Sequence, residues 1–552
     1  MLSYRKLAMR VLGRPLHTEG IDSPRPASQR AAAFVLTAAM LTTLAAPAFA
    51  DIWRIEDGDI TVKAGETEGT NKVSQGTNKD VVDTDTIITN QNKDIASSHT
   101  VTIDAGSAKV EVTLDNVKIK ANSGSALTSK GDVTLTLKGD NHLTGGNGSG
   151  GSGGSGISSS GSLTISGSKN DSLTAQGGSG NGEDSSGGDG ISSSGSLTIS
   201  DGMVTATGGD STGSDGSGGY GINNNGGVTI SGGTVTANGG NGAVGSGGDG
   251  IFSFHHVAIS GGTVTANGGS GEDGGDGIRS FDPVAISGGT VTANGGSGNF
   301  SGGRGISSRS GVAISGGTVN ANGGDGKNGS GGSGIFSFGR VAISGSTVNA
   351  AGGSSSSNGG SSSSNSGSGI YSSGIDLSGS LELTAKAGSP NGKALSQNGK
   401  ELDLDTIKDK LGPGAKVTAT DADGKVIDQV STPRPVEPEE SFSSSDGGSA
   451  APSAPASPLP GLTVTDKDGQ RISYTSTQSG NTLTVCVGRF TASFRISLAA
   501  LRQLRAEGIE TITFQTILCS TTLSVDELLA MGGEDAEAVL THRFTDSSLT
   551  VG

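Results

Sequence analysis

The chain has 552 residues, of which 99 are Gly, while hydrophobic residues make up 31% and aromatic residues only 3%. This length exceeds one ordinary domain, and the composition excludes a conventional apolar core, which leaves either disorder or a repeat that needs Gly at fixed positions. The formal net charge of −16 argues against a nucleic-acid partner, because phosphate binding requires clustered Lys and Arg.

Residues 1–50 have the pattern of a signal peptide. Basic residues within 5–30 precede an apolar run over 31–46, and Ala48-Phe49-Ala50 fits an A-x-A cleavage site before Asp51. The apolar run is shorter than the roughly 20 residues that cross a membrane, although an uncleaved signal anchor is the alternative. We therefore expect a bacterial protein that is secreted or held in the cell envelope, with no membrane span in the mature chain.

Residues 51–145 contain alternating apolar residues, as in Val110-Glu111-Val112-Thr113-Leu114. Alternation with period two is typical of strands that bury one face. We expect an N-terminal cap followed by the first coils of a repeat structure, with Trp53, the only Trp, closing the end of the core.

Residues 146–390 repeat a unit that is marked by a Gly-Ile dipeptide after a Gly-rich run. The marker residues are Ile157, Ile191, Ile222, Ile251, Ile278, Ile306, Ile335 and Ile370, with spacings of 34, 31, 29, 27, 28, 29 and 35 residues.

Each unit holds a short strand after Gly-Ile, a second strand such as Val257-Ala258-Ile259, a Gly-Gly turn, a third strand such as 263–267, and a Gly-rich loop. Three short strands in each unit of roughly 29 residues predict a mainly β fold, a parallel, right-handed β-helix solenoid. The alternative, a flexible Gly/Ser linker, would not keep Val and Ile at fixed offsets through seven units. The equivalent residues Asn238, Asn267, Asn294 and Asn322 are expected to form a structural ladder of hydrogen-bonded amides along the axis.

The remaining chain changes character. Residues 391–430 are expected to end the solenoid, residues 431–460 are a Pro/Ser-rich linker, and residues 461–552 form a small α+β domain. In that domain we expect strands at 462–465, 471–475, 483–487, 490–496 and 511–516, and helices at 498–505 and 525–531, the second with Ser524 as N-cap. Cys486 and Cys519 would form one disulfide bridge or remain two small buried residues, and the sequence leaves both open.

Aromatic residues mark the candidate binding face. In Ile251-Phe252-Ser253-Phe254 the isoleucine points inward, so both phenylalanines should point outward. Stacking of the units aligns one column of Phe254, Phe281, Arg309 and Phe338, and a neighbouring column of Phe252, Arg279, Ser307, Phe336 and Tyr371. Exposed aromatic rings suit sugar stacking or a protein contact, unless the Gly-rich segments cover them.

Acidic residues precede several Gly-Ile dipeptides. Asp249 and Asp276 occupy the same position in successive units, with Asp189 before them and Arg304 after them. Two carboxylates near strand spacing would repel each other unless a cation such as calcium lies between them or Arg304 compensates. We expect solvated turn aspartates here, and keep Asp249 and Asp276 as candidate calcium ligands.

Catalytic patterns are missing from the sequence. There is no Ser/His/Asp arrangement, P-loop, paired-carboxylate pocket or zinc pattern, and His255 and His256 would point to opposite faces of one strand. We therefore expect no enzymatic activity and no cofactor other than the calcium considered above.

Three strings carry a resemblance to a known group: Gly195-Ser196-Leu197-Thr198-Ile199-Ser200, residues 230–237, and more loosely Gly131-Asp132-Val133-Thr134-Leu135. They resemble exported β-helix proteins of Gram-positive gut and cellulolytic bacteria that are often labelled carbohydrate-binding. The resemblance covers about residues 100–390. It implies binding of plant polysaccharide, in some cases with calcium, and it transfers no binding residue to a position here.

The sequence thus favours a non-catalytic, exported β-helix that binds carbohydrate or a surface partner. A structural, adhesin-like stalk that displays the C-terminal domain is the second hypothesis. A polysaccharide lyase is the third, and the few scattered basic residues of the array disfavour it.

Overall fold

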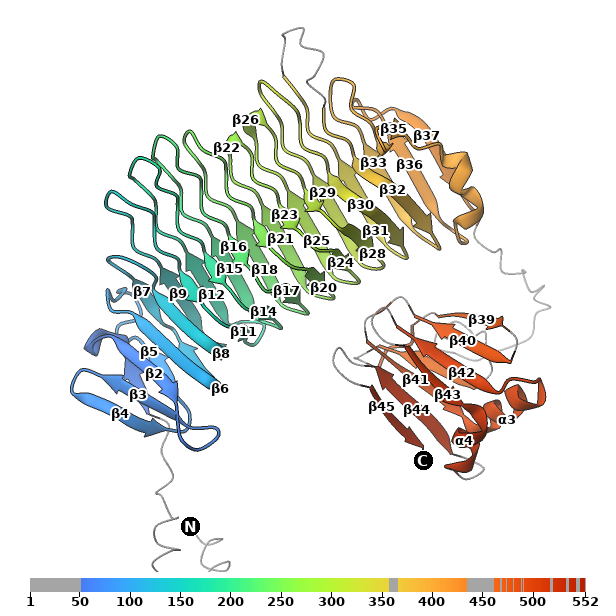
Figure 1. The fold of residues 1–552 in the computed structure, drawn as a ribbon, viewed down its shortest axis with the longest axis horizontal. Helices are drawn as coiled ribbons and strands as arrows, with labels where there is room; N and C mark the ends of the chain where they lie inside the picture. The colour runs from blue at the N-terminus through green and yellow to red at the C-terminus, as the bar shows by residue number, and fades with distance from the viewer. Residues whose placement is uncertain are drawn as a thin grey trace, which may run out of the picture. The chain divides into compact units, whose positions relative to one another are not determined.

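A computed structural model describes residues 51–356, 366–433 and 461–552, apart from 467–468, 473, 480, 488, 490, 517–519, 533–535, 543–546 and 552. The expected signal peptide, most of the expected linker and Cys519 lie outside the described residues. The described residues form a mainly β structure, with long parallel sheets that are consistent with a β-helix solenoid (Figure 1).

The N-terminal segment combines two short antiparallel strand pairs with strands that join the parallel stack. Its elements are β1 (Ile52–Arg54), η1 (Ile55–Asp57), β2 (Ile60–Ala64), β3 (Asn71–Gln75), β4 (Asn78–Asp83), β5 (Ile87–Thr89), β6 (Val101–Asp115), β7 (Lys118–Lys120), β8 (Leu127–Lys138) and β9 (Asp140–Thr144). The antiparallel pairs are β2–β3 and β3–β4, and β2 also pairs parallel with β6. The buried indole of Trp53 donates a hydrogen bond to Asp83 Oδ2 at 2.9 Å, which fixes the position of the ring at this end of the core.

In the repeats, the strands that start at the marker isoleucines and the second strands belong to one sheet. The first strands are β10 (Ile157–Ser159), β13 (Ile191–Ser193), β16 (Ile222–Asn224), β19 (Ile251–Ser253), β23 (Ile278–Ser280) and β27 (Ile306–Ser308). The second strands are β11 (Leu163–Ser166), β14 (Leu197–Ile199), β17 (Val228–Ile230), β20 (Val257–Ile259), β24 (Val284–Ile286) and β28 (Gly311–Ile314), and both positions merge in β30 (Ile335–Ser344) and β32 (Ile370–Ser378).

The third strands form a second parallel sheet. They are β12 (Ser172–Gln176), β15 (Met203–Thr207), β18 (Thr234–Asn238), β21 (Thr263–Asn267), β25 (Thr290–Asn294), β29 (Thr318–Asn322), β31 (Thr347–Ala351) and β33 (Glu382–Lys386). Equivalent residues pair in register, so Ile251 lies against Ile278 and Ala266 against Ala293. Each repeat therefore adds Ile, Val and Ala side chains to one continuous core, as the period-two alternation predicts.

The Gly-rich arms, the segments that leave each third strand and return to the next first strand, pack side by side (Figure 1). In residues 239–250 the Gly240 N–H donates to Gly219 O of the preceding repeat, and the Gly248 N–H donates to Gly240 O. Backbone approaches so closely that a Cβ on Gly248 would lie 2.0 Å from Gly219 O. These segments were expected to be loops; they are hydrogen-bonded layers in which Gly occupies positions where a Cβ would collide with the neighbouring backbone. Short strands β22 (Gly271–Asp273) and β26 (Gly298–Ser301) pair within them.

The stack ends within residues 391–431, with β34 (Leu395–Gln397), β35 (Lys400–Glu401), η2 (Leu404–Lys410), β36 (Lys416–Thr420) and β37 (Val426–Ser431). Residues 461–552 contain two mixed or antiparallel sheets and a separate buried cluster. Their elements are β38 (Leu462–Thr465), β39 (Thr475–Ser479), β40 (Thr482–Cys486), β41 (Ala492–Ser497), α3 (Leu498–Ala506), β42 (Thr511–Gln515), β43 (Ser520–Ser524), α4 (Val525–Ala530), β44 (Glu537–His542) and β45 (Ser547–Val551).

In this segment Ser524 Oγ accepts the Glu527 N–H, as predicted for an N-cap. The strand expected over 471–475 is wrong: β39 begins only at Thr475. Three further strands, β43, β44 and β45, were not predicted. The Cys486 thiol is free and half-buried, and its expected relation to Cys519 falls outside the described residues.

Candidate functional site

The first strand of each repeat presents the candidate binding residues. In β19 the side chains of Ile251 and Ser253 are fully buried, so Phe252 between them faces outward and is half-buried. Phe254 follows the strand and is 53% exposed, and its equivalent Phe338 is 65% exposed. The Gly-rich arms therefore do not cover these two rings.

The register aligns Phe252, Arg279, Ser307, Phe336 and Tyr371 in one outward column. Because Ser307 carries no ring, the aromatic contacts fall into two groups along this column. We call the whole the aromatic face, made of Tyr220, Phe252, Phe254, Phe281, Phe336, Phe338 and Tyr371 with Arg279, Arg304 and Arg309.

The first group is centred on Phe252. Its ring stacks on Tyr220 with centroids 5.1 Å apart, and Phe254 and Phe281 pack edge to face at 4.6 Å. The Arg309 guanidinium lies 4.2 Å from the centre of the Phe281 ring. Arg279 lies 5.8 Å from the centre of the Phe252 ring, so cations as well as rings line this part of the face.

The second group contains Phe336, which lies between two planar groups. The Arg304 guanidinium is 3.9 Å from the centre of its ring, and Tyr371 stacks on it at 5.2 Å with an interplanar angle of 7°. Phe338 packs against its edge at 4.9 Å. Arg304, Phe336 and Tyr371 border a pocket of about 480 Å³ whose other lining residues are mainly Ser and Gly.

The carboxylates of Asp249 and Asp276 are not solvated, which corrects the expectation from their turn-like surroundings. Asp249 is 3% exposed and Asp276 is 6% exposed. Asp249 Oδ1 accepts the Asp276 backbone N–H at 2.6 Å, and Asp276 Oδ1 accepts the Arg304 backbone N–H at 2.6 Å. Each carboxylate thus serves as the acceptor for the equivalent residue one repeat later, as Asp189 does for Tyr220.

Burial disfavours the charged form of these groups. Burial, and next the repulsion of Asp276, raise the pKa of Asp249 to about 8. Its Oδ2 has no hydrogen-bond partner, and Arg279 Nη1 lies 3.8 Å away, too far for a hydrogen bond but close enough to offset part of the charge. Burial, with Asp249 nearby, also raises the pKa of Tyr220 to about 12.

Among the described residues, no third His, Cys, Asp or Glu side chain completes a calcium site with Asp249 and Asp276. Backbone N–H groups occupy one oxygen of each carboxylate, and Arg279 supplies a positive charge at the orphaned oxygen. Calcium binding here stays a prediction without structural support.

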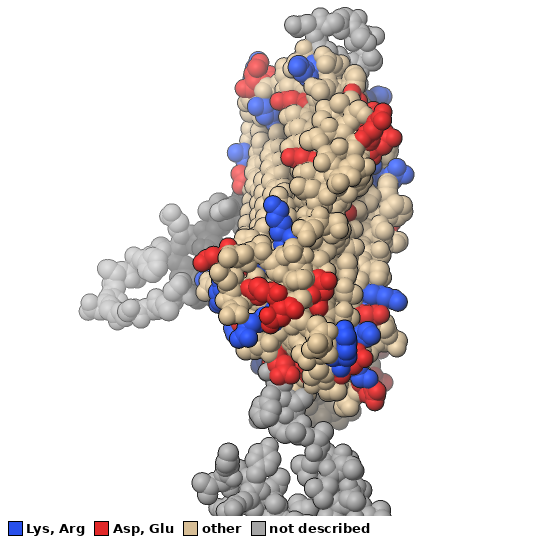
Figure 2. Space-filling view, turned by 90° about the vertical axis from the view of Figure 1, so that its left-hand side faces the viewer, with Lys and Arg blue, Asp and Glu red and all other residues tan. Residues whose placement is uncertain are grey.

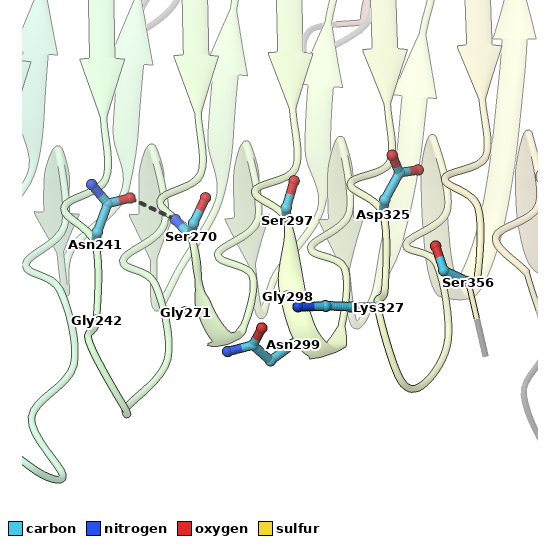
Figure 3. Close-up of a pocket in the computed structure, with 10 residues that line it drawn as sticks. All are labelled: Asn241, Gly242, Ser270, Gly271, Ser297, Gly298, Asn299, Asp325, Lys327 and Ser356. Carbon is cyan, nitrogen blue, oxygen red and sulfur yellow. Dashed lines mark hydrogen bonds between the residues drawn. The ribbon is translucent and has the colours of Figure 1, made fainter. Parts of the chain in front are cut away.

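A second hollow, of about 350 Å³, lies among the Gly-rich arms (Figure 3). Its lining is polar, with Asn241, Ser270, Ser297 and Asp325 on four successive arms and Lys327 extending beside Asn299. Asn241 Oδ1 accepts the Ser270 N–H at 2.9 Å, as drawn in Figure 3. Side chains of this polar lining form hydrogen bonds to the backbone of the neighbouring arm, and the lining contains no aromatic residue. We therefore assign it a structural role.

The predicted amide ladder is confirmed on the third strands. Asn267, Asn294 and Asn322 each donate from Nδ2 to the Oδ1 of the preceding Asn at 2.8 Å, beginning at Asn238. These amides satisfy one another, which supports the structural role expected from the sequence.

On the face shown in Figure 2, acidic and basic side chains are interspersed and large areas carry neither. None of the helices in the described residues has the length and apolar character needed to span a membrane.

Sequence reasoning missed two members of the site. Tyr220 occupies the repeat position that Asp249 occupies one repeat later, yet its ring stacks on Phe252 of the following repeat. The alignment of repeat positions does not predict such a contact between different positions. Arg304 was seen only as a partner for aspartate, yet its guanidinium covers Phe336. The scarcity of Tyr, four in the chain, was the available signal for Tyr220.

Comparisons with protein-family models, with curated proteins and with solved structures found no match for this chain.

Proposed function

We propose that this chain is an exported, non-catalytic protein, a right-handed parallel β-helix followed by a small α+β domain, that binds carbohydrate through its aromatic face. The observation that carries the proposal is a row of solvent-facing rings on one face of a regular stack. Phe254 and Phe338 are 53% and 65% exposed, although aromatic residues make up only 3% of the chain. Exposed apolar rings beside cations and hydroxyls are typical of ligand-binding surfaces.

The non-catalytic part of the proposal is supported by the acidic pair. Asp249 has a pKa suited to acid–base chemistry, but its carboxylate is buried and one oxygen is bound by the Asp276 N–H. A general acid must reach the atom that it protonates. This also disfavours a polysaccharide lyase.

A glycan array tests the proposal with the chain from Asp51 onward, with and without a chelator. We expect retention on at least one polysaccharide, and an approximately tenfold loss for Phe254→Ala combined with Phe338→Ala, since each stacked ring contributes about 0.5–1.5 kcal/mol. Phe300→Ala is the matched control, because Phe300 is 53% exposed but lies on β26 in an arm. If no glycan is retained, or the control weakens retention equally, the proposal is wrong.

An adhesin-like stalk is the second candidate. The in-register amides and the hydrogen bonds between Gly-rich arms stiffen the stack along its axis whether or not a ligand binds. An intact fold without glycan retention would favour this function.

A further inference from the structure

The second aromatic group ends at Tyr371. Arg304, Phe336 and Tyr371 lie one above another, with Phe336 in contact on both faces. The next residue in the column is Ser396, which pairs in register with Tyr371, is buried and carries no ring. The row of planar groups therefore stops beside the pocket of about 480 Å³, which Tyr371 and Ser396 both line.

The other walls of this pocket supply polar groups from three repeats. Ser333, Ser368 and Asn391 line it together with several glycines, which leave the backbone uncovered. The volume is in the range of pockets that hold small ligands, and hydroxyl and amide groups beside a ring suit a sugar residue.

The charged side chains that line the pocket are all cationic. Arg304 and Lys393 are its ionisable residues apart from Tyr371, and it contains no Asp or Glu. Glu401 lies near Lys393, but its two carboxylate oxygens accept the Ala394 and Leu395 N–H groups at 3.1 and 2.6 Å. Arg304 also borders the adjoining hollow with Asp249, Asp273 and Asp276, whereas Lys393 lines, of these two, only the pocket without Asp or Glu.

We propose that this pocket binds a saccharide residue that carries an anionic group, a carboxylate or a sulfate, with its ring against Tyr371 and its anion beside Lys393 and Arg304. The inference rests on the proposed carbohydrate binding and adds the ligand class and its place. On a chain with a net charge of −16, an anionic polymer is repelled overall, so binding must come from such local cations.

The test uses the chain from Asp51 onward on surfaces coated with polygalacturonate, dextran sulfate or neutral dextran, in the presence of a chelator. We expect at least tenfold tighter binding to one anionic polymer than to dextran, and the preferred polymer identifies the carboxylate or the sulfate. Lys393→Gln should weaken this binding about tenfold and Tyr371→Ala should weaken it several-fold, while Tyr371→Phe keeps the ring and most of the binding. Lys327→Gln is the control, because Lys327 lines the other hollow and is exposed.

The outcomes separate this inference from the proposed function. Equal binding to dextran and the anionic polymers, or equal losses for Lys327→Gln and Lys393→Gln, would overturn the anionic pocket. Retention on a neutral glycan that needs Phe254 and Phe338 would then leave carbohydrate binding standing. No retention on any polysaccharide would overturn both. Unchanged melting temperatures show that the variants are folded.

Discussion

Neighbouring residues in the stack determine the hydrogen bonding and the pKa of Asp249. Its carboxylate supplies the acceptor that the Asp276 N–H needs, but the second oxygen is left buried without a hydrogen bond. A buried carboxylate without full pairing favours the neutral form, which is why its pKa rises to about 8. In the unfolded chain the pKa of an Asp side chain is about 3.9. The folded state therefore loses stability as the pH rises from about 4 to about 8, and the loss is complete above that range.

Asp249→Asn removes this titration and keeps the oxygen that accepts the Asp276 N–H. We expect the variant to be more stable than the parent by a few kcal/mol at pH 8.5, with a melting temperature higher by roughly 5 °C or more, and to show little difference near pH 4. Thermal unfolding at both pH values checks this, with Asp215→Asn at an exposed arm position as the control. A constant difference between the variant and the parent at all pH values would contradict the burial argument.

The sequence could predict the outward direction of Phe252 and Phe254, because strand alternation is a local property. It could not predict that Asp249 and Asp276 are buried. Their burial depends on how Gly-rich arms from neighbouring repeats pack over them, and a Gly-Gly-Asp-Gly string looks the same in a solvated turn. The pocket that Lys393 lines could not be predicted either, because Lys393 lies after the last marker isoleucine and has no equivalent position in the repeats.

At the scale of elements, the arms are the main departure from expectation. Gly runs carry no periodic apolar signal, so local reasoning takes them for loops. The structure shows instead that backbone N–H groups of the described arms donate to carbonyl oxygens of the arms beside them, as Gly247 N–H does to Asp273 O at 2.9 Å. Strand β39 is a related case: Thr475–Ser479 has no apolar pattern and becomes a strand through pairing with β40.

Gly248→Ala tests the role of close approach in the arms. A Cβ there would lie 2.0 Å from Gly219 O, so two backbones must separate and their hydrogen bonds weaken. We expect a loss of about 3 kcal/mol or more and faster cleavage of the arms by a protease. Gly151→Ala is the control, since nothing lies within 4 Å of a Cβ at that position. Similar melting and cleavage of the two variants would show that the contact is not required.

At the scale of the whole molecule, the two buried clusters share no residue. One extends from Trp53 to Val430 and grows by the same Ile, Val and Ala positions in each repeat. The other, within residues 461–552, gathers Phe494, Phe514 and helix residues such as Leu501 around its own sheets. A segment with its own core can fold alone, and a repeat stack gains stability from each neighbouring interface.

We therefore expect two independent thermal transitions in the chain from Asp51 onward. A protease site inserted at residue 450, between the two clusters, should release fragments that each keep the melting temperature seen in the intact chain, because each buried cluster lies wholly within one fragment. Far-ultraviolet circular dichroism of the separated fragments measures this. Loss of structure in the fragment from residue 461 onward, or a single joint transition in the intact chain, would mean that the segment depends on the stack and is not merely carried by it.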